Sequence, residues 1–262
     1  YTSSMGTIMV GTSGYSYNDW VGPFYPKGTP SEQFLERYGE YFTTVELNFS
    51  YYRMPTADQL RAMGEVNSSL SFTLKAHQSL THKIVPAEWR SEAQTFRRAL
   101  EPLLKANTLK ALLLQFPYSF HYEVEQRRYL DALLHYWEGL PLAVEFRHTQ
   151  WYNNRTIEAL RERQVALVAL DLPNLTNLPP HIDVVTAPFA YLRLHGRNKE
   201  NWWGSDVASR YDYLYSPKEL LSIAERARTL AATTPLTLVY FNNHRGGQAV
   251  QNALSLKELL DG

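Results

Sequence analysis

A carboxylate and a guanidinium stand two residues apart in a segment that otherwise has the composition of a buried strand. Glu145 and Arg147 belong to the stretch LAVEFR, residues 142–147. Successive side chains of a strand point to opposite faces, so these two share one face. A carboxylate there could act as a general acid or base, and an arginine could hold a phosphate or carboxylate through paired hydrogen bonds. We therefore predict that this face lines a site.

The same alternation places polar side chains in the last half of most other strand-like segments. Glu46 and Glu145 could form the carboxylate pair that glycoside hydrolysis requires. A desolvated Lys75 could act as a Schiff-base nucleophile, although a lysine near two carboxylates is more often an ion-pair partner. The catalytic candidates are Glu46, Lys75, Glu145, Asp171 and His195, and the substrate-binding candidates are Arg147, Arg193, Asn48, Gln115, Asn242, Asn243, Trp202, Trp203 and Tyr15.

The segments that carry these residues alternate with helical patterns. Each strand-like run except the sixth is followed by a helical pattern, and such alternation is typical of a TIM (β/α)8 barrel, whose active sites lie at the carboxyl ends of the strands. The eight runs are residues 7–12, 44–49, 71–76, 110–116, 142–147, 165–171, 189–196 and 236–243. Clear helical patterns cover about 90–106, 123–138, 154–163, 217–232 and 247–260.

The predicted fold is an α/β fold with one domain, a TIM barrel over residues 7–260, preceded by residues 1–6 as an N-terminal extension. An open doubly wound sheet is the alternative, and such sheets often carry a glycine-rich phosphate loop after the first strand. The first turn here, GTSGYSYNDW, has neither the G-x-G-x-x-G nor the P-loop spacing. Helix starts with capping residues are predicted at Thr29, Pro30 and Glu32, at Thr56 and Gln59, and at Ser216, Pro217 and Glu219.

The charge balance gives no attraction to nucleic acid or to an anionic membrane. Basic and acidic residues number 26 each, so the formal net charge is zero. The chain has no cysteine, which excludes disulfides and thiolate zinc sites. No apolar run approaches the roughly 18 residues of a membrane span. We expect a cytoplasmic protein with a small-molecule substrate and no membrane partner.

Metal-free chemistry is predicted, with a divalent metal as the alternative. Cations interleaved with the candidate ligands, namely Lys75, Arg147 and Arg193, would lower the affinity for a divalent ion. No cofactor is therefore predicted. The side chains that could supply metal ligands are His77, His82, Glu145, His148, Asp171 and His195.

Two loops after the last strands have the composition of ligand-binding loops. The loop after the seventh strand concentrates aromatic residues, including Trp202, Trp203 and Tyr211, which either pin the loop to the barrel or stack on a sugar or base. After the eighth strand, Gly246 and Gly247 open a helix whose free amides could hold an anion. Phosphate binding at the last two strands is frequent in TIM barrels.

The segments GTSGYSYNDWVGPFYP, TVELNFSYYRMP, KAHQSLTH, LLQFPYSF, VEFRHTQW, YLRLHGRNKENWW…RYDYLYS and VYFNNHRGGQAVQNAL together resemble the YecE-like family, domain-of-unknown-function family 72. The resemblance spans residues 7–260 in order. It implies a TIM barrel that is named as related to sugar isomerases and is similar in fold to endonuclease IV and xylose isomerase. His77 stands where the family pattern often has proline.

The predicted function is that of an enzyme, a hydrolase or isomerase, acting on a phosphorylated or sugar-like compound in a charged pocket. One alternative is a nucleic-acid-binding protein that uses the aromatic loop, or a metal-dependent phosphodiesterase similar to endonuclease IV. Another is a non-catalytic metabolite-binding protein, which would be stabilised by its ligand without turning it over.

Overall fold

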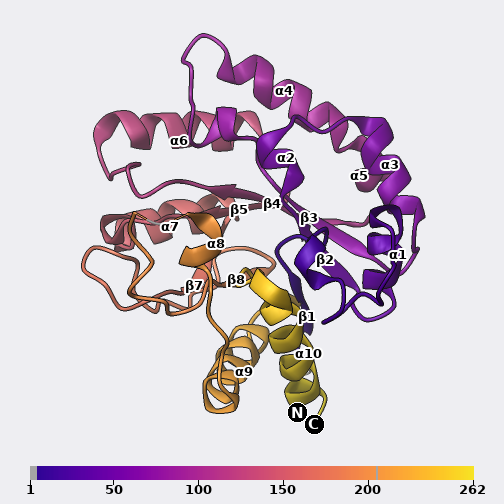
Figure 1. Ribbon diagram of the computed structural model, residues 1–262. Coiled ribbons are helices and arrows are strands. Elements are labelled where there is room, and N and C mark those ends of the chain that lie inside the picture. The colour runs from indigo at the N-terminus through magenta and orange to yellow at the C-terminus, as the bar shows by residue number, and fades with distance from the viewer. Residues whose placement is uncertain (1–4, 205) are drawn as a thin grey trace.

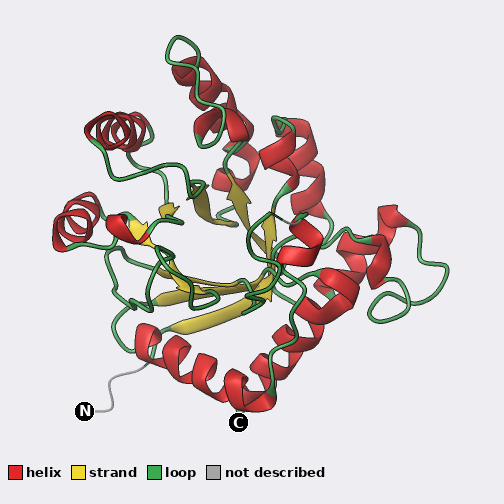
Figure 2. Ribbon diagram, turned by 60° about the vertical axis from the view of Figure 1, so that its left-hand side comes forward, coloured by secondary structure: helices red, strands yellow, loops and turns green. Residues whose placement is uncertain are grey.

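Parallel strands form the centre of the computed structural model, which describes residues 5–204 and 206–262 (Figure 1). The strands are β1 (Thr7–Thr12), β2 (Thr44–Leu47), β3 (Ser71–Lys75), β4 (Leu109–Gln115), β5 (Leu142–Glu145), β6 (Ala166–Leu167), β7 (Ala169–Asp171), β8 (Ala190–Leu194) and β9 (Leu236–Phe241). They pair in the orders β1-β9-β8-β7 and β2-β3-β4-β5-β6. Helices surround them on the outside (Figure 2). The predicted TIM-barrel fold is confirmed.

The two sheets are joined at both of their edges. β6 and β7 are one predicted strand, interrupted at Val168, whose N–H still donates to Val144 O at 2.9 Å. The chain itself therefore passes from one sheet to the other. At the opposite edge, Ser13 and Glu46 form a parallel bridge, and Gly14 N donates to Glu46 O at 2.7 Å. Glu46 thus lies where the first and second strands meet.

The helices follow the strands largely as predicted. No helix follows the sixth strand within residues 172–189. The predicted helix over 90–106 is divided at Leu100, because Pro102 has no N–H to continue the preceding helix and instead starts a new one. The helices are α1 (Phe34–Gly39), α2 (Phe49–Tyr52), α3 (Ala57–Glu65), α4 (Trp89–Ala99), α5 (Glu101–Lys105), α6 (Val124–Tyr136), α7 (Asn154–Arg163), α8 (Val207–Arg210), α9 (Pro217–Ala231) and α10 (Gln248–Asp261).

Two of the three predicted helix starts are confirmed. Thr56 and Ser216 each form a complete capping box with the residue three positions later. The start at Thr29 is wrong, because Thr29 Oγ1 donates to Pro26 O at 2.6 Å instead of capping. The chain there forms a short 3-10 turn, Ser31–Gln33, before α1 begins. None of the described helices has both the length and the apolar composition needed to cross a membrane.

The strand alternation produces two separate apolar cores. Residues of one parity pack between the strands and the surrounding helices, and residues of the other parity pack together inside the barrel. The inner set includes Leu113, Ala143 and Leu170 on the strands, and it continues into Trp202 and Tyr211 from the loop after β8. This loop therefore covers the end of the barrel at which the strands finish.

Candidate functional site

Glu46 and Arg193 form an ion pair inside the barrel near the carboxyl ends of the strands. Glu46 comes from β2 and Arg193 from β8, and both side chains are buried. Arg193 Nε donates to Glu46 Oε1 and Arg193 Nη2 donates to Oε2, both at 2.9 Å. The Tyr191 hydroxyl also donates to Oε1, at 2.5 Å. Both carboxylate oxygens of Glu46 therefore accept from buried donors.

Glu145 is bound by three different side chains. Arg193 Nη1 donates to Glu145 Oε1 at 2.9 Å, and Arg147 Nε donates to Oε2 at 2.6 Å. His195 Nε2 lies 3.2 Å from the same Oε2. On the other side of the imidazole, Asn242 Nδ2 lies 2.9 Å from Nδ1. With the amide oriented this way, Nδ1 accepts and Nε2 carries the proton, so a neutral His195 completes the shell of Glu145.

The electrostatics of this cluster keep both carboxylates ionised. Burial alone would raise the pKa of each, but the Arg193 guanidinium outweighs it and lowers the pKa of Glu46. Arg193 and Arg147 together hold the pKa of Glu145 well below its usual range. Burial, reinforced by the charge of Arg147, lowers the pKa of His195 to about 3 despite the opposing pull of Glu145. The two carboxylates are therefore charged and the imidazole neutral near pH 7.

Lys75 lies on the same inner face, at the end of β3, but it is bound differently. Its ammonium lies 4.5 Å from the centre of the Tyr51 ring, and the residue as a whole is half-buried. Among the described residues it has no carboxylate within ion-pair distance and no hydrogen-bond acceptor. Burial, together with the charges of Arg193 and Arg147, lowers the pKa of Lys75 to about 7. Lys75 is thus the cation of this cluster that no described carboxylate binds.

The loop after β8 covers part of the cluster. Arg147 Nη2 donates to the Tyr211 hydroxyl at 3.2 Å, and the guanidinium carbon lies 5.7 Å from the centre of the Trp202 ring. Burial would raise the pKa of Tyr211, but Arg147 outweighs it and the pKa is lowered. Arg147 Nη1 has no acceptor within residues 5–204 and 206–262. One donor nitrogen of Arg147 is therefore left for a ligand.

Six of the predicted residues come together here, namely Glu46, Lys75, Glu145, Arg147, Arg193 and His195. Asn242 joins them through His195. Gln115 is on the inner face of β4 beside Glu145 in the strand register, and its amide donates to Phe116 O at 2.6 Å. Asn48 follows β2, and its buried Oδ1 has no hydrogen-bond partner in the described part of the chain.

Asp171 does not join this cluster. It shares its parity with Ala169, which packs in the outer core, and its side chain lies between the strands and α9. Arg197 binds both carboxylate oxygens at 2.9 Å, and the Tyr215 hydroxyl donates to Oδ2 at 2.7 Å. The prediction that Asp171 faces the inside of the barrel was wrong. Asp171 ends a strand that is apolar on both faces, so alternation could not show which face its side chain takes.

Other predicted binding residues also lie elsewhere. Asn243 is fully buried on the outer side, where its amide donates to Tyr213 O and to Asn252 Oδ1. Tyr15 packs against Tyr38, with ring centres 6.4 Å apart. Trp203 is 48% exposed and meets Tyr118 edge to face. The predicted anion site at Gly246 is already occupied, because Gly246 N donates to Asp19 Oδ2 at 2.7 Å.

Three tyrosines outside the predicted site residues contact the cluster, and the sequence indicated only Tyr211 among them, as an aromatic residue of the loop after β8. Tyr191 binds Glu46, Tyr211 binds Arg147 and Tyr51 lies against Lys75. The alternation of β8 could have indicated Tyr191, which shares its parity with Arg193.

As for a metal, no three His, Asp or Glu side chains form a potential ligand group anywhere in residues 5–204 and 206–262.

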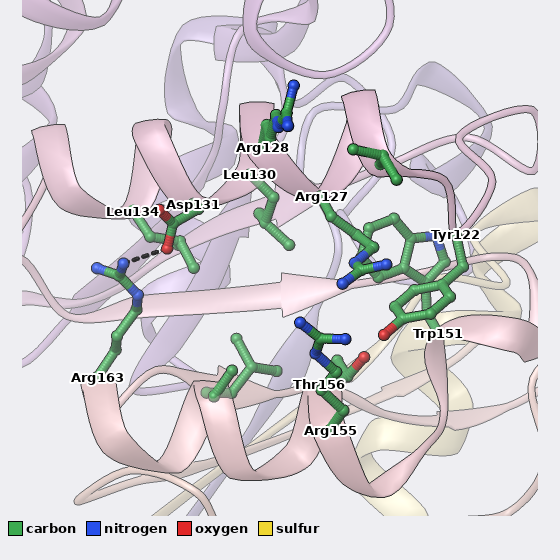
Figure 3. A pocket seen from close by; sticks show the side chains of 13 residues that line it. Tyr122, Arg127, Arg128, Leu130, Asp131, Leu134, Trp151, Arg155, Thr156 and Arg163 are labelled. Carbon is green, nitrogen blue, oxygen red and sulfur yellow. Dashed lines mark hydrogen bonds and ion pairs between the residues drawn. The ribbon is translucent and has the colours of Figure 1, made fainter.

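A hollow lies on the outside of the barrel, between α6 and α7 (Figure 3). It has a volume of about 440 Å³ and contains none of the predicted site residues. Arg127 from α6 and Arg155 from α7 extend toward one another in it, and Arg163 pairs with Asp131. Trp151 stacks on Phe120 and on Phe146, with ring centres 5.3 and 4.3 Å apart. This groove is basic.

The fold and this cluster define a TIM-type α/β barrel protein with a buried ionic network at the carboxyl ends of its strands. The chain belongs to the family described as Protein of unknown function DUF72, which it matches over residues 9–262. It is 29% identical to the UPF0759 protein YunF of Bacillus subtilis strain 168 over 270 residues, covering 97% of this chain and 95% of that protein.

Solved structures of the same family agree with this assignment. A DUF72 family protein from Thermotoga maritima is 38% identical with a TM-score of 0.89, and the match covers 97% of this chain and 99% of that one. A DUF72 family protein from Enterococcus faecalis is 26% identical with a TM-score of 0.86, covering 98% and 96%. The family carries no established activity in its description, so the function is argued from the cluster.

Proposed function

We propose that the protein is an enzyme that binds a small phosphorylated or sugar-like compound at the carboxyl ends of its strands. One observation carries this proposal. The arginines satisfy both buried carboxylates, yet Lys75 and one nitrogen of Arg147 keep hydrogen-bond donors without a described acceptor. Unused donors beside a buried ionic network are typical of a pocket that holds an anionic or hydroxyl-rich ligand.

The charge of the cluster supports an anionic ligand. Glu46 and Glu145 contribute two negative charges, and Arg147 and Arg193 balance them. A protonated Lys75 adds one positive charge that no described carboxylate balances. Binding of a phosphate or carboxylate group would supply the missing negative charge. Arg147 would bind this anionic group, since its guanidinium is already oriented by hydrogen bonds to Glu145 and Tyr211.

The chemistry supported best is proton transfer on the ligand, as in an isomerisation. A hydrolytic carboxylate pair needs one protonated member. The pKa of Glu46 and of Glu145 is lowered, which leaves neither of them as a proton donor near pH 7. Lys75, whose pKa lies at about 7, can both accept and return a proton in that range. An isomerase reaction is therefore favoured over the hydrolase alternative.

The test is a melting-temperature screen with inorganic phosphate, sugar phosphates and free sugars. A ligand that binds the folded protein raises its melting temperature with concentration. We expect at least one sugar phosphate to do so in the wild type, and Lys75→Met to reduce the shift at equal concentration. Lys83→Met, which removes an exposed lysine from the following loop, is the matched control and is expected to keep the shift.

Turnover of the stabilising compound is then followed by NMR at pH 7. Rearranged product from the wild type but not from Lys75→Met is the result that the proposal predicts. Stabilisation without any turnover would contradict the enzyme proposal in favour of a metabolite-binding protein. No stabilisation by any compound of this class would contradict the proposed ligand.

A further inference from the structure

We infer that the Lys75 amine is a nucleophile that condenses with the carbonyl carbon of its ligand, so that the substrate class is an anionic aldehyde or ketone. The inference rests on the proposed function and narrows its ligand. It starts from the position of the amine. Lys75 is at the end of β3 on the inner face and lies over the Tyr51 ring at 4.5 Å. It is half-buried, whereas the ionic pairs beside it are buried.

The neighbours of Lys75 leave its nitrogen lone pair available. A lysine that is fixed by a carboxylate stays protonated and cannot attack a carbonyl. Here the two nearby carboxylates, Glu46 and Glu145, are engaged by Arg193 and Arg147 at 2.6–2.9 Å. The attraction of these carboxylates for the Lys75 ammonium is weaker than the opposing effects. Burial and the two arginine charges together disfavour the protonated amine.

The imidazole beside Lys75 adds no charge to its surroundings. His82 comes from the loop after β3 and packs edge to face on Tyr51, with ring centres 4.9 Å apart. Burial, helped by the charges of Lys75 and Arg147, lowers the pKa of His82 to about 3, so it is a neutral neighbour. A desolvated lysine beside other cations is the arrangement that activates amines for imine formation. Arg147, with a free Nη1, is placed to hold the anionic group.

The proposed step balances without any oxidant or reductant. The unprotonated Nζ attacks the carbonyl carbon, a C–N bond forms, and the carbonyl oxygen takes up a proton. The attacking nitrogen releases one proton to solvent, which gives a neutral carbinolamine. The hydroxyl of the carbinolamine takes up a further proton from solvent and leaves as water when the C–O bond breaks, while the nitrogen lone pair forms the C=N bond of a cationic imine. That cation withdraws electrons from the adjacent carbon, so a proton there is released more easily, and addition of water later restores Lys75. The proton transfer of the proposed isomerisation would then take place next to the imine carbon.

The experiment traps the imine by reduction. The full chain is incubated at pH 7 with glyceraldehyde 3-phosphate and cyanoborohydride, and modified peptides are quantified by mass spectrometry. The chain has eight lysines, so seven others report on non-specific labelling. We expect Lys75 to be modified at least about ten times faster than any of them, since a desolvated lysine beside other cations holds a much larger unprotonated fraction at this pH than a lysine of a model peptide. Lys83→Met is expected to leave that rate unchanged, and Lys75→Arg to abolish the adduct.

Phosphate-free glyceraldehyde tests the anionic part of the inference. It is expected to label Lys75 more slowly than the phosphorylated aldehyde, and equal rates would overturn the assignment of an anionic substrate. Labelling of Lys75 no faster than the other lysines would overturn the nucleophile. If sugar phosphates still raised the melting temperature in that case, the proposed function would stand without the imine. If they did not, both would fail.

Discussion

Two buried ionic networks lie at the same end of the barrel, one inside it and one outside. The inner network joins Glu46, Glu145 and Arg193, while the outer one joins Asp171 to Arg197. Both satisfy their carboxylates with arginines and tyrosine hydroxyls. They differ in their neighbouring hydrogen-bond donors. Only the inner network adjoins an amine and a guanidinium nitrogen that have no acceptor among the described residues.

This difference shows what each network is suited for. Arg197 belongs to the loop after β8 and is 32% exposed, and it also binds Glu219 on α9 at 3.0 Å. The outer network therefore ties a loop and a helix to the barrel wall. The inner network holds Arg147 in a fixed orientation beside Lys75. A saturated ionic network can thus be a structural tie or the support of a site, and the neighbouring free donors distinguish the two.

The largest effect is expected from breaking the inner network at Arg193. Arg193→Met leaves two carboxylates buried without their main partner, so the free energy of unfolding should fall by about 3–5 kcal/mol. Urea denaturation at pH 7 measures it. Arg161→Met, in an exposed pair with Glu158, is the control and should cost less than about 1 kcal/mol. Equal costs for the two variants would show that the inner network contributes no more than a surface pair.

A smaller effect is expected from Asp171→Asn in the outer network. The amide keeps one oxygen for Tyr215 or Arg197 but loses the charge, and a partly exposed Arg197 can be hydrated instead. We expect a loss of about 2–3 kcal/mol and faster proteolysis of the loop after β8. Asp212→Asn, in the exposed pair with Arg245, is the matched control. If ligand-induced stabilisation were lost in Asp171→Asn as well, the division between a tie and a site would be wrong.

The smallest effect on stability is expected from Lys75→Met. The pKa of Lys75 is lowered from 10.5 to about 7, so below pH 7 the folded state bears the cost of a desolvated ammonium. Between pH 7 and 10.5 the unfolded state binds the proton more tightly, so this contribution makes the wild type more stable as pH rises. Lys75→Met should therefore melt about 2–4 °C above the wild type at pH 6.5.

The difference between these two proteins should shrink as the pH rises from 7 towards 10.5, because the amine of the folded protein is then neutral and the cost of a desolvated ammonium is lost. Lys83→Met provides the control, since it removes an exposed lysine from the loop that follows β3. A Lys75→Met protein that melts well below the wild type at pH 6.5 would mean that Lys75 has a stabilising partner.

Strand alternation was sufficient to predict most of the inner network. In β2, β5 and β8 one face is apolar and the other carries charge, so the sequence indicates which side chains meet. Asp171 could not be assigned in this way, since residues 165–170 are apolar on both faces. Asn242 and Asn243 are adjacent, and only one of two neighbours can face the lumen.

The contributions of loops were beyond the same reasoning. Tyr211 reaches Arg147 across 64 positions of sequence, and Tyr51 reaches Lys75 from the helix after β2. No periodicity relates such residues, because their contacts depend on how loops fold over the barrel. The groove between α6 and α7 is another example, since its arginines belong to two ordinary amphipathic helices. The fold was therefore predictable to a greater extent than the surroundings of the cluster.

The most direct measurement is an NMR titration of the lysine side chains in the wild type. Chemical shifts of labelled lysine ε-carbons report the protonation of each amine, and the spectrum of Lys75→Met identifies the signal of Lys75. We predict that this signal titrates near pH 7. A midpoint for Lys75 above pH 10 would show that the amine is an ordinary ammonium and would contradict the central claim that the inner network adjoins a reactive group.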